Sequence, residues 1–571
     1  MKDLNPQEHA ARFTELETQA ANFRNLWQEI QEYVTPWRDP ITSSRGIGQK
    51  QTDRIFDSTA PTSLTISAAA VHSLTAPAGV RWFNLSHPDP EVAMLVEVGQ
   101  ALETATNAVR SSIHNSNFSQ ESQEVVLDLL AYGTGAIYWE MKNPTGTNPW
   151  PGIRFRALSP GSYVISEDAE GIVDTLYRKF SLSAGAIYRR WPETCGDVVK
   201  KLCAEGKLDH KMLVIHGVFP RHENVDMSNT MSVMPKNRPF GSIWLVTEGM
   251  GEEHRTGNAA GLSPGIDAKG SQVLREDGFF DFPFLVPRWY KMSGESYGRS
   301  PIMNVLPTIR TLNKAVELRL KAWQLAIAPP MVTSDRGIIG DVRLNPFGRT
   351  HSKGDPRTAI MALNIGSDFN VANFQEEILK NEIKSALFID QIASAQSQGL
   401  TPKSATEVSI NFEMMMRILG PVSTRLQGEF LVPIVTGIYR ALVRHEILST
   451  DMMSELGEGG TSVIFEGPLA RSTSIQEIDA ISRWLQVALP LAEMKPEVLR
   501  YVDFEALGKV AADAVGIPRS IMKTDDAIQA EKEQEAQAQA MQGMMGMGTQ
   551  VADIMNKVQP AVTQGAAPGG L

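Results

Sequence analysis

The stretch Tyr297-Gly298-Arg299-Ser300-Pro301 opens a long helical pattern that continues as IMNVLPTIRTLNKAVELRLKAWQLAIAPP to residue 330. Apolar residues recur there with the spacing 4-3-4-4-3-4, which places them on one face of an α-helix. Pro329-Pro330 ends the pattern, because proline cannot continue the backbone hydrogen bonding. We therefore predict a helix over residues 301–328 with the apolar positions Val305, Ile309, Leu312, Val316, Leu320, Trp323 and Ile327.

The chain after this helix changes character three times. Residues 329–372 hold short β-like pieces between Gly, Pro, Asn and Asp residues, which favour turns. Apolar residues at helical spacing then predict a second helix over residues 373–390. Residues 391–406 are small and polar without periodicity, and a long helix over 407–446 follows. Proline should bend this last helix, because it removes a backbone hydrogen bond, at Gly420-Pro421 and at Pro433.

The two ends of the chain are helical in pattern. Helical patterns continue over residues 447–530, and residues 531–571 become rich first in Gln, Ala and Glu and then in Met and Gly, as in a low-complexity tail. At the N-terminus a 3-4-3-4-3-4 spacing predicts one amphipathic helix with Phe13, Leu16, Ala20, Phe23, Trp27, Ile30 and Val34 on its buried stripe.

The part between the N-terminal helix and Tyr297 is mixed. Helical patterns cover residues 53–77, 90–115 and 118–132, and Arg81 to Leu85 reads as a strand. Residues 150–290 are β-rich, and residues 249–271 form a Gly-rich polar loop. The fold class is therefore α+β. The predicted strands are Ile153–Leu158, Tyr163–Ser166, Thr175–Phe180, Leu213–Phe219, Ser242–Thr247 and Phe284–Tyr290.

Composition excludes several classes of protein. The 571 residues carry a formal charge of −11, whereas a protein that binds DNA phosphates tightly normally presents a basic surface. Two cysteines, Cys195 and Cys203, argue against a disulfide framework and lack the spacing of paired zinc ligands. No apolar stretch reaches the length of a membrane helix, and the N-terminus has no secretory signal.

No motif in the sequence predicts catalysis, so no catalytic residue, metal ligand or cofactor is assigned. The phosphate-binding loop, the zinc-protease helix and the C-x-x-C pair are all absent. Residues 261–265 match G-x-S-x-G, but their flanks are polar loop residues. Pro264 also removes the backbone N–H that an oxyanion hole would use. An enzyme would need residues that converge only in the fold.

A series of short motifs resembles the head-to-tail connector, or portal protein, of short-tailed, podovirus-type bacteriophages. The joint order of the motifs carries the resemblance, which extends over most of the chain. In chain order they are Trp27 to Pro36, Ile55 to Ala60, Leu74 to Phe83, Tyr132 to Gly135, Phe282 to Phe284, Arg288-Trp289, Tyr297 to Pro301, Leu312-Asn313, Pro329-Pro330, Ala405 to Val408 and Gly467 to Ala470.

The resemblance implies a ring, usually of twelve copies, at one vertex of a capsid, with DNA passing through a central channel. It implies a mainly helical portal fold whose parts are called wing, stem, clip and crown. Mapped onto this sequence, they are a wing at 1–300, a first stem helix at 301–328, a clip at 329–372, a second stem helix at 373–390, a channel loop at 391–406, a kinked tunnel helix at 407–446, a crown at 447–530 and a tail at 531–571.

Two sets of residues become candidates for contacts. In the channel loop, Lys403 stands near Gln396, Ser397 and Gln398, and one sparse ring of positive charge would give transient, sequence-independent contact with phosphates. An ordinary exposed lysine at a helix start explains Lys403 nearly as well. In the clip, the candidates for contacting the packaging motor and the tail adaptor are Arg336, Asp341, Arg343 and Arg349, although plain surface polarity explains any single one of them better.

The resemblance also implies partners and a location. The partners are further copies of the chain, non-specific double-stranded DNA, the terminase large subunit, a tail adaptor, and the scaffolding and major capsid proteins, with no membrane. The location is the virion, after assembly in the bacterial host cytoplasm. Two alternatives stay open: another head or tail structural protein, or a nucleic-acid enzyme such as a motor or nuclease.

Overall fold

The computed structural model of the chain divides into two compact units. The larger unit comprises Met1–Trp82 and Val109–Ile447, and the smaller comprises Phe83–Ala108 and Leu448–Leu571. The structure describes residues 5–42, 50–77, 81–89, 92, 95–142, 150–221, 235–247, 271–327, 331–333, 338–339, 351–352, 360–362, 369–389, 420–448, 461–465 and 486.

The N-terminal stripe forms two helices. α1 spans Pro6–Gln19 and α2 spans Ala21–Tyr33, and the backbone leaves the helical path at Ala20, where ψ is −5°. The prediction of one continuous helix is therefore wrong, although the predicted stripe is buried apart from the half-buried Phe23. The break has a tertiary cause, because α1 packs against strand β4 (Tyr163–Glu167) while α2 packs against helix α9 (Pro301–Ile327).

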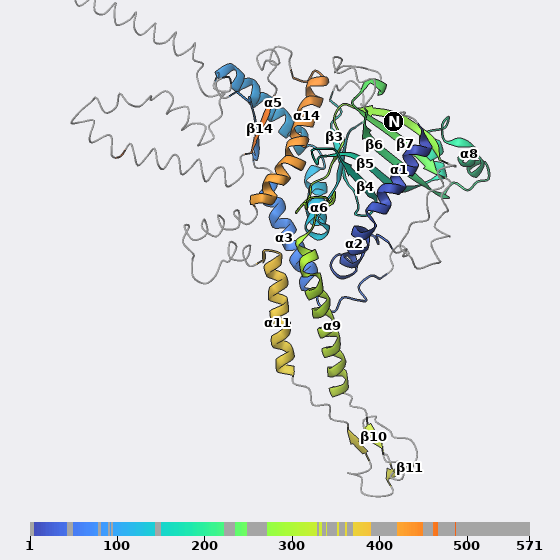
Figure 1. Ribbon diagram of the computed structural model, residues 1–571, viewed down its shortest axis with the longest axis vertical. Coiled ribbons are helices and arrows are strands. Elements are labelled where there is room, and N and C mark those ends of the chain that lie inside the picture. The colour runs from blue at the N-terminus through green and yellow to red at the C-terminus, as the bar shows by residue number, and fades with distance from the viewer. Residues whose placement is uncertain are drawn as a thin grey trace, which may run out of the picture. The chain divides into compact units, whose positions relative to one another are not determined.

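Five antiparallel strands form the main sheet in the order β4-β5-β6-β7-β8 (Figure 1). Neighbouring strands are consecutive in the chain, and each runs antiparallel to the next. One face belongs to the main core, and two short helices, α7 and α8, cover apolar side chains of the other. The bounds are β5 Val173–Ser183, β6 Lys211–Pro220, β7 Phe240–Thr247, β8 Gln272–Phe279, α7 Ala184–Arg190 and α8 Gly196–Ala204.

The predicted strands between residues 163 and 247 are all present in this sheet. Strand β8 and the helices α7 and α8 were not predicted. α7 has only seven residues, and Ser183 caps it by accepting the N–H of Ala186 at 3.3 Å. A helix of two turns shows too little periodicity to be recognised in a sequence.

A second sheet has the order β3-β2-β9, with β2 at Ile137–Met141, β3 at Ile153–Ala157 and β9 at Phe284–Leu285. The prediction of a strand over 284–290 is wrong beyond Leu285. The chain continues there through isolated bridges, which pair Thr134 with Arg288 and Tyr290 with Arg299. This irregular segment, residues 286–300, leads directly into α9.

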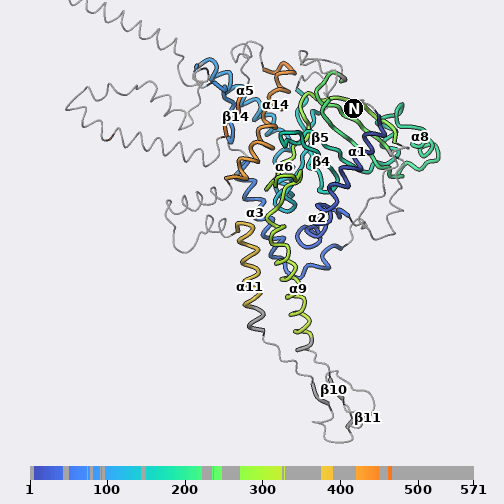
Figure 2. The backbone as a smooth tube through the Cα atoms, in the orientation of Figure 1, coloured from blue at the N-terminus to red at the C-terminus, as the bar shows by residue number. Residues whose placement is uncertain are grey.

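Two long helices form a hairpin, here called the helical hairpin: α9 and α11 (Phe369–Ala386), which lie side by side in Figures 1 and 2 and contact each other. Both predicted helices are confirmed, although α11 begins four residues before its predicted start. Short antiparallel strands lie between the helices in sequence. β10 (Met331–Thr333) pairs with β13 (Ile360–Ala362), and β11 (Ile338–Ile339) pairs with β12 (His351–Ser352).

Helices α3 (Thr59–Thr75) and α6 (Phe118–Tyr132) pack against each other, and α3 also contacts α11. They correspond to the helices predicted over 53–77 and 118–132. His72 and Ser122 are hydrogen-bonded between them at 2.8 Å, from Nε2 to Oγ, and burial lowers the pKa of His72. Helices α3 and α6 therefore form a helical layer against the hairpin.

The helix from Gly420 to Arg444 is interrupted by a π turn, η4 (Gln427–Leu431), directly before α14 (Val432–Arg444). This π turn lies directly before Pro433, where the sequence predicted a bend. By length and composition this helix could cross a membrane, but 56% of its most apolar window is buried. Its apolar side chains, including Phe430 and Ile438, lie inside the protein, as in a core helix.

In the smaller unit, β1 (Phe83–Ser86) pairs antiparallel with β14 (Ser462–Phe465). The N–H of Leu85 donates to Thr106 Oγ1 at 3.0 Å, which joins β1 to α5 (Val96–His114). The predicted strand at 81–85 is present, but its partner is far away in the sequence, and no local pattern indicates such a pairing.

Two backbone segments meet at Gly133 and Gly298, a contact named here the glycine crossing. Gly133 ends α6 with φ at +81°, a left-handed conformation that favours glycine. A Cβ on either glycine would lie under 3.0 Å from the carbonyl oxygen of the other. The Gly298 N–H donates to Thr134 Oγ1 at 2.8 Å, and the Trp289 N–H donates to the Gly133 carbonyl at 2.9 Å.

We predict that Gly298→Ala lowers the free energy of unfolding by about 2–4 kcal/mol, because the new methyl group meets backbone that cannot rotate away. Urea denaturation followed by circular dichroism measures the loss. Gly420→Ala is the matched control, since no heavy atom lies within 4 Å of a Cβ there and alanine favours a helix. Equal losses in the two variants would contradict the role of the crossing.

Candidate functional site: the base of the helical hairpin

The residues predicted to contact DNA, Lys403, Gln396, Ser397 and Gln398, lie outside the described residues. The same holds for the clip candidates Arg336, Asp341, Arg343 and Arg349. The stretch that begins at Tyr297 is described in full. The site that can be built from the structure is therefore the base of the helical hairpin, where this stretch meets the rest of the larger unit.

Tyr297 is buried among aromatic rings at this base. Its ring centroid lies 5.3 Å from those of Phe23 and Trp27, and both of these residues come from α2. Its hydroxyl accepts the N–H of Ile165 at 3.2 Å, and burial raises its pKa, so the phenol stays neutral. Tyr297 thus joins the N-terminal helices to strand β4 at the point where the hairpin begins.

Ser300 and Pro301 start α9, as the sequence predicted. Ser300 Oγ accepts the N–H of Met303 at 3.1 Å, which satisfies one of the free donors of the first turn. Pro301 suits the first helical position because its missing N–H would have no partner there. The stretch from Tyr297 to Pro301 is therefore a helix start, and no chemistry is needed to explain its residues.

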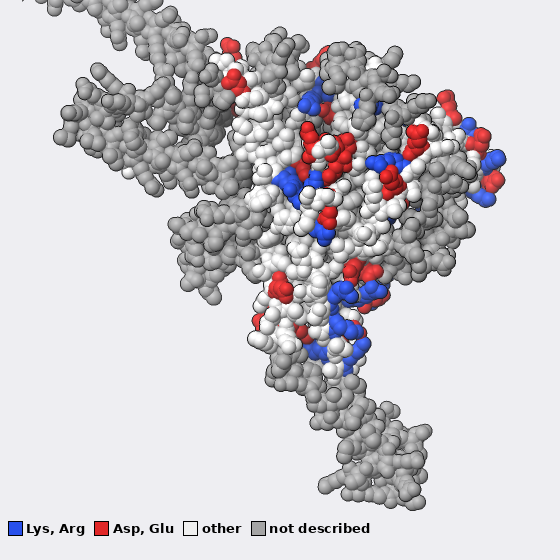
Figure 3. Space-filling view, viewed as in Figure 1, with Lys and Arg blue, Asp and Glu red and all other residues white. Residues whose placement is uncertain are grey.

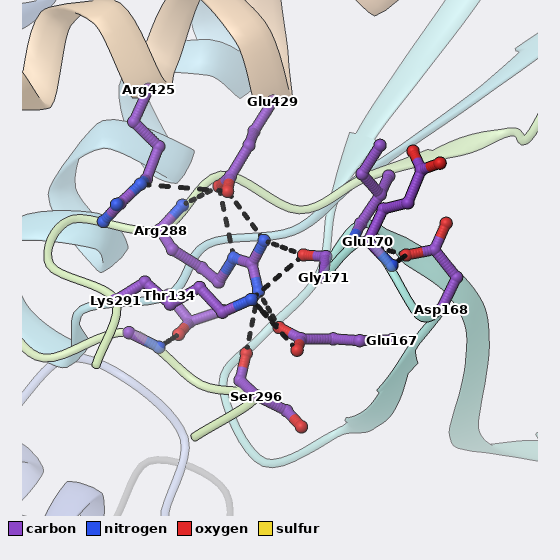
Figure 4. Close-up of polar contacts among 12 residues, drawn as sticks. Thr134, Glu167, Asp168, Glu170, Gly171, Arg288, Lys291, Ser296, Arg425 and Glu429 are labelled. Atoms are coloured by element: carbon purple, nitrogen blue, oxygen red, sulfur yellow. Dashed lines mark hydrogen bonds and ion pairs between the residues drawn. The ribbon is translucent and has the colours of Figure 1, made fainter. Parts of the chain in front are cut away.

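An ionic cluster around the buried Arg288 lies beside the glycine crossing, and Figure 4 shows the carboxylates of Glu167 and Glu429 directed toward the guanidinium of Arg288 from two sides. Arg288 is 2% exposed. These three residues and Lys291 are named the Arg288 cluster. Arg288 Nη2 bonds Glu429 Oε1 at 2.6 Å, and Arg288 Nη1 pairs with Glu167.

Further hydrogen bonds satisfy the remaining donors of the cluster. The backbone N–H of Arg288 donates to Glu429 Oε2 at 2.9 Å, and Nη2 donates to the Gly171 carbonyl at 3.0 Å. Lys291 Nζ bonds Glu167 at 3.0 Å and the Gly171 carbonyl at 3.1 Å. Buried charges persist when they are paired and hydrogen-bonded in this way.

The cluster connects four separate parts of the chain: the end of β4, the turn before β5, the segment 286–300 and the π turn η4. The motif Arg288-Trp289 was part of the resemblance, but no role could be given to it from the sequence. The carboxylates that bind Arg288 belong to Glu167 and Glu429, which are 121 and 141 residues away in the chain. Only the fold brings them together.

Polar contacts also hold the middle of α9 against the segment that contains Phe56 and Asp57. Asn313 is 3% exposed, and its Oδ1 accepts the N–H groups of Phe56 at 2.8 Å and Asp57 at 3.1 Å. Lys380 of α11 pairs with Asp57 at 2.9 Å. Burial opposes ionisation of Asp57, but hydrogen bonds from Thr59 and Lys380 lower its pKa on balance. Both helices of the hairpin are thus bound to one short segment.

The two helices are also joined directly. Arg319 of α9 pairs with Glu376 of α11 at 2.6 Å, and Glu376 is 4% exposed. Thr308 Oγ1 donates to Glu382 at 3.3 Å, and Ile383 is fully buried in the main core. These contacts give the hairpin a defined inner face, and its other faces are left for solvent or for a partner.

The described residues contain no group of three or more His, Cys, Asp or Glu that could hold a metal ion. Cys195 is buried and Cys203 half-buried, and both are free thiols. The buried carboxylates at the hairpin base bond cations and backbone N–H groups. This arrangement positions helices.

A helical hairpin thus extends from a body of sheets and helices, and an ionic cluster around Arg288 lies near the start of its first helix (Figure 1). The chain belongs to the family of bacteriophage head to tail connecting proteins, whose model matches residues 6–261 and 262–522. The resemblance seen in the sequence is thereby confirmed.

Curated relatives cover nearly the whole chain. A probable portal protein of Bordetella phage BPP-1 is 25% identical over 96% of this chain and 94% of its own length. The portal protein of Salmonella phage epsilon15 is 23% identical over 93% and 92%, and that of Escherichia phage T7 is 23% identical over 90% and 84%.

We predict that Asn313→Ala destabilises the base of the hairpin by about 1–3 kcal/mol, because two backbone N–H groups lose their acceptor. Amide hydrogen exchange around Phe56 and Asp57 should accelerate. Asn304→Ala, at an exposed position of the same helix, is the control and should leave this exchange unchanged. Faster exchange in both variants would show that the effect belongs to α9 in general.

Proposed function

We propose that the chain is a portal subunit: copies of it form a closed ring at one vertex of a phage capsid, and double-stranded DNA passes through the ring. The observation that carries this proposal is the family match over residues 6–522, together with portal relatives of nearly equal length. The helical hairpin supports it, since it is a projecting arm that offers surface to neighbours.

In this proposal the parts of the portal fold take the positions expected from the sequence. α9 and α11 are the stem helices, the strands β10 to β13 belong to the clip, and the sheets with the N-terminal helices form the wing. The channel loop at 391–406, the crown at 447–530 and the tail at 531–571 are assigned by resemblance, because they lie wholly or almost wholly outside the described residues.

Exposed apolar side chains on the hairpin support self-association. On α11, Phe374 is 66% and Ile378 51% exposed, and on α9, Ile327 is 85% exposed. Leu318, Leu320 and Trp323 of α9 are exposed as well. A group of exposed apolar residues on one arm is typical of a surface that a partner covers, and in a ring this partner is the next copy of the chain.

The charges on the two helices differ. Figure 3 shows Lys and Arg gathered over the stem, and on α9 the side chains of Arg310, Lys314 and Lys321 are more than half exposed along one stripe. On α11, Glu382 is exposed one helical turn from Ile378. A head-to-tail contact, α9 of one copy against α11 of the next, would bring two different faces together, and such contacts close into rings.

The proposed ring acts on DNA as a conduit. The chain carries a net charge of −11, so a ring of copies does not gain affinity through broad phosphate contact. Lys403, with Gln396, Ser397 and Gln398 nearby, would supply sparse contacts in the channel. We assign the clip, with Arg336, Asp341, Arg343 and Arg349, to docking of the terminase motor and the tail adaptor. ATP hydrolysis belongs to that separate motor.

We predict that Ile378→Asp prevents or weakens ring formation, because it places a carboxylate in the apolar contact beside Glu382. Native mass spectrometry and electron microscopy of the purified chain measure the ring. Leu208→Asp is the control, since Leu208 is 51% exposed and lies in the wing away from the hairpin. Wild-type protein that stays monomeric at high concentration, or that hydrolyses ATP or DNA, would contradict the portal function itself.

We predict that Lys403→Ala leaves the ring intact but alters packaging or retention of DNA, because the channel loses its ring of positive charge. Packaged genome length in phage particles measures this. Lys207→Ala, at an exposed position of the wing, serves as the control. Unchanged packaging in the Lys403 variant would remove the channel-loop lysine from the proposal.

A further inference from the structure

The π turn η4 divides the helix from Gly420 to Arg444 into two parts. The Val432 N–H bonds the carbonyl of Gln427, five residues earlier, so the turn holds one residue more than an α-helical turn. Pro433 gives a local reason, because it has no N–H to offer the carbonyl of residue 429 in a regular helix. A helix with proline at this place can contain a π turn or a proline kink.

Each part of the helix is held separately. After the π turn, Ile434, Val435, Ile438 and Leu442 are at most 1% exposed. Arg440 and Arg444 pair with Asp281 at 2.9 and 2.7 Å.

Before the π turn, Val422 and Leu426 are buried in the main core at 2% and 3% exposure. Within the turn, Glu429 makes three hydrogen bonds to Arg288, through its backbone N–H, Nε and Nη2. The extra residue therefore lies between two independently fixed segments.

The alternative to the π turn changes the direction of every side chain before it. Loss of one residue from the turn rotates the preceding helix by roughly 100° and moves it by roughly 1.5 Å along its axis. Glu429 would then point away from Arg288 and could not keep its three hydrogen bonds. Val422 and Leu426 would leave their present places in the core.

Arg288 relays the position of Glu429 to the start of the stem. The backbone of Arg288 binds Glu429, and the next residue, Trp289, donates its N–H to the carbonyl of Gly133 in the glycine crossing. Thr134 then accepts the N–H of Gly298, two residues before Ser300 and the first turn of α9. A continuous set of hydrogen bonds thus runs from the π turn to the first stem helix.

We propose that η4 is a two-register switch, in which the Glu429–Arg288 pair holds the π register and its release lets residues 420–426 rotate against α14. This inference rests on the proposed function. There, residues 420–426 are the end of the tunnel helix before the π turn, so the switch rotates that part of the helix and reports the change to the stem through Arg288. Residues 432–444, after the turn, stay fixed. Residues 420–426, before the turn, move.

The test compares Glu429→Gln with Arg440→Met in the full-length assembled protein. Glu429→Gln keeps the shape but loses the charge that pairs with Arg288, and Arg440→Met removes an ion pair from the same helix beyond the π turn. Hydrogen exchange measured by mass spectrometry should rise about tenfold or more in residues 420–431 and 286–299 of the Glu429 variant, with residues 434–444 unchanged. Arg440→Met should leave residues 420–431 unchanged.

Equal acceleration on both sides of the π turn, or no difference between the variants, overturns the switch. If the Glu429→Gln variant does not assemble, deletion of Gly428 tests the switch instead. This deletion removes the extra residue of the π turn directly. The switch requires the deletion chain to form rings with fast exchange at residues 286–299, and loss of the folded ring overturns it. Rings of wild-type protein in the same experiment test the portal function separately.

Discussion

Two backbones pass each other at Gly133 and Gly298 so closely that neither position has space for a side chain. Much of the larger unit depends on this contact. It ends α6, orders the irregular segment 286–300 and fixes the start of α9 through the hydrogen bond from Gly298 to Thr134. Since a helix extends rigidly from its first turn, a small displacement at the crossing becomes a larger one at the far end of α9.

The Arg288 cluster reinforces the crossing from the side. Burying the charge of Arg288 costs free energy, and good hydrogen-bond geometry offsets that cost without much surplus. The benefit is specificity, because Arg288 has its partners in only one arrangement of β4, the segment 286–300 and the π turn.

The helical hairpin follows a different principle. Its inner face is closed by Arg319 and Glu376 and by buried apolar residues, but Phe374, Ile378 and Ile327 remain exposed. In the proposed ring, the next copy of the chain would cover these residues. α9 and α11 differ in sequence, so each copy has two different faces to offer. This asymmetry suits a closed ring better than a symmetric pair.

Patterns within one segment determined much of the secondary structure. Helical spacing located α9, α11 and α6, alternation and turn residues located most strands, and the order of short motifs identified the family. Local patterns could not show that the N-terminal stripe breaks at Ala20, because the break follows from packing on two different surfaces. Only the tertiary structure decided the role of Arg288, the pairing of β1 with β14 and the contact of Gly133 with Gly298. Each joins residues more than a hundred positions apart, and such contacts arise from the packing of whole elements, which leaves no periodic trace in the sequence.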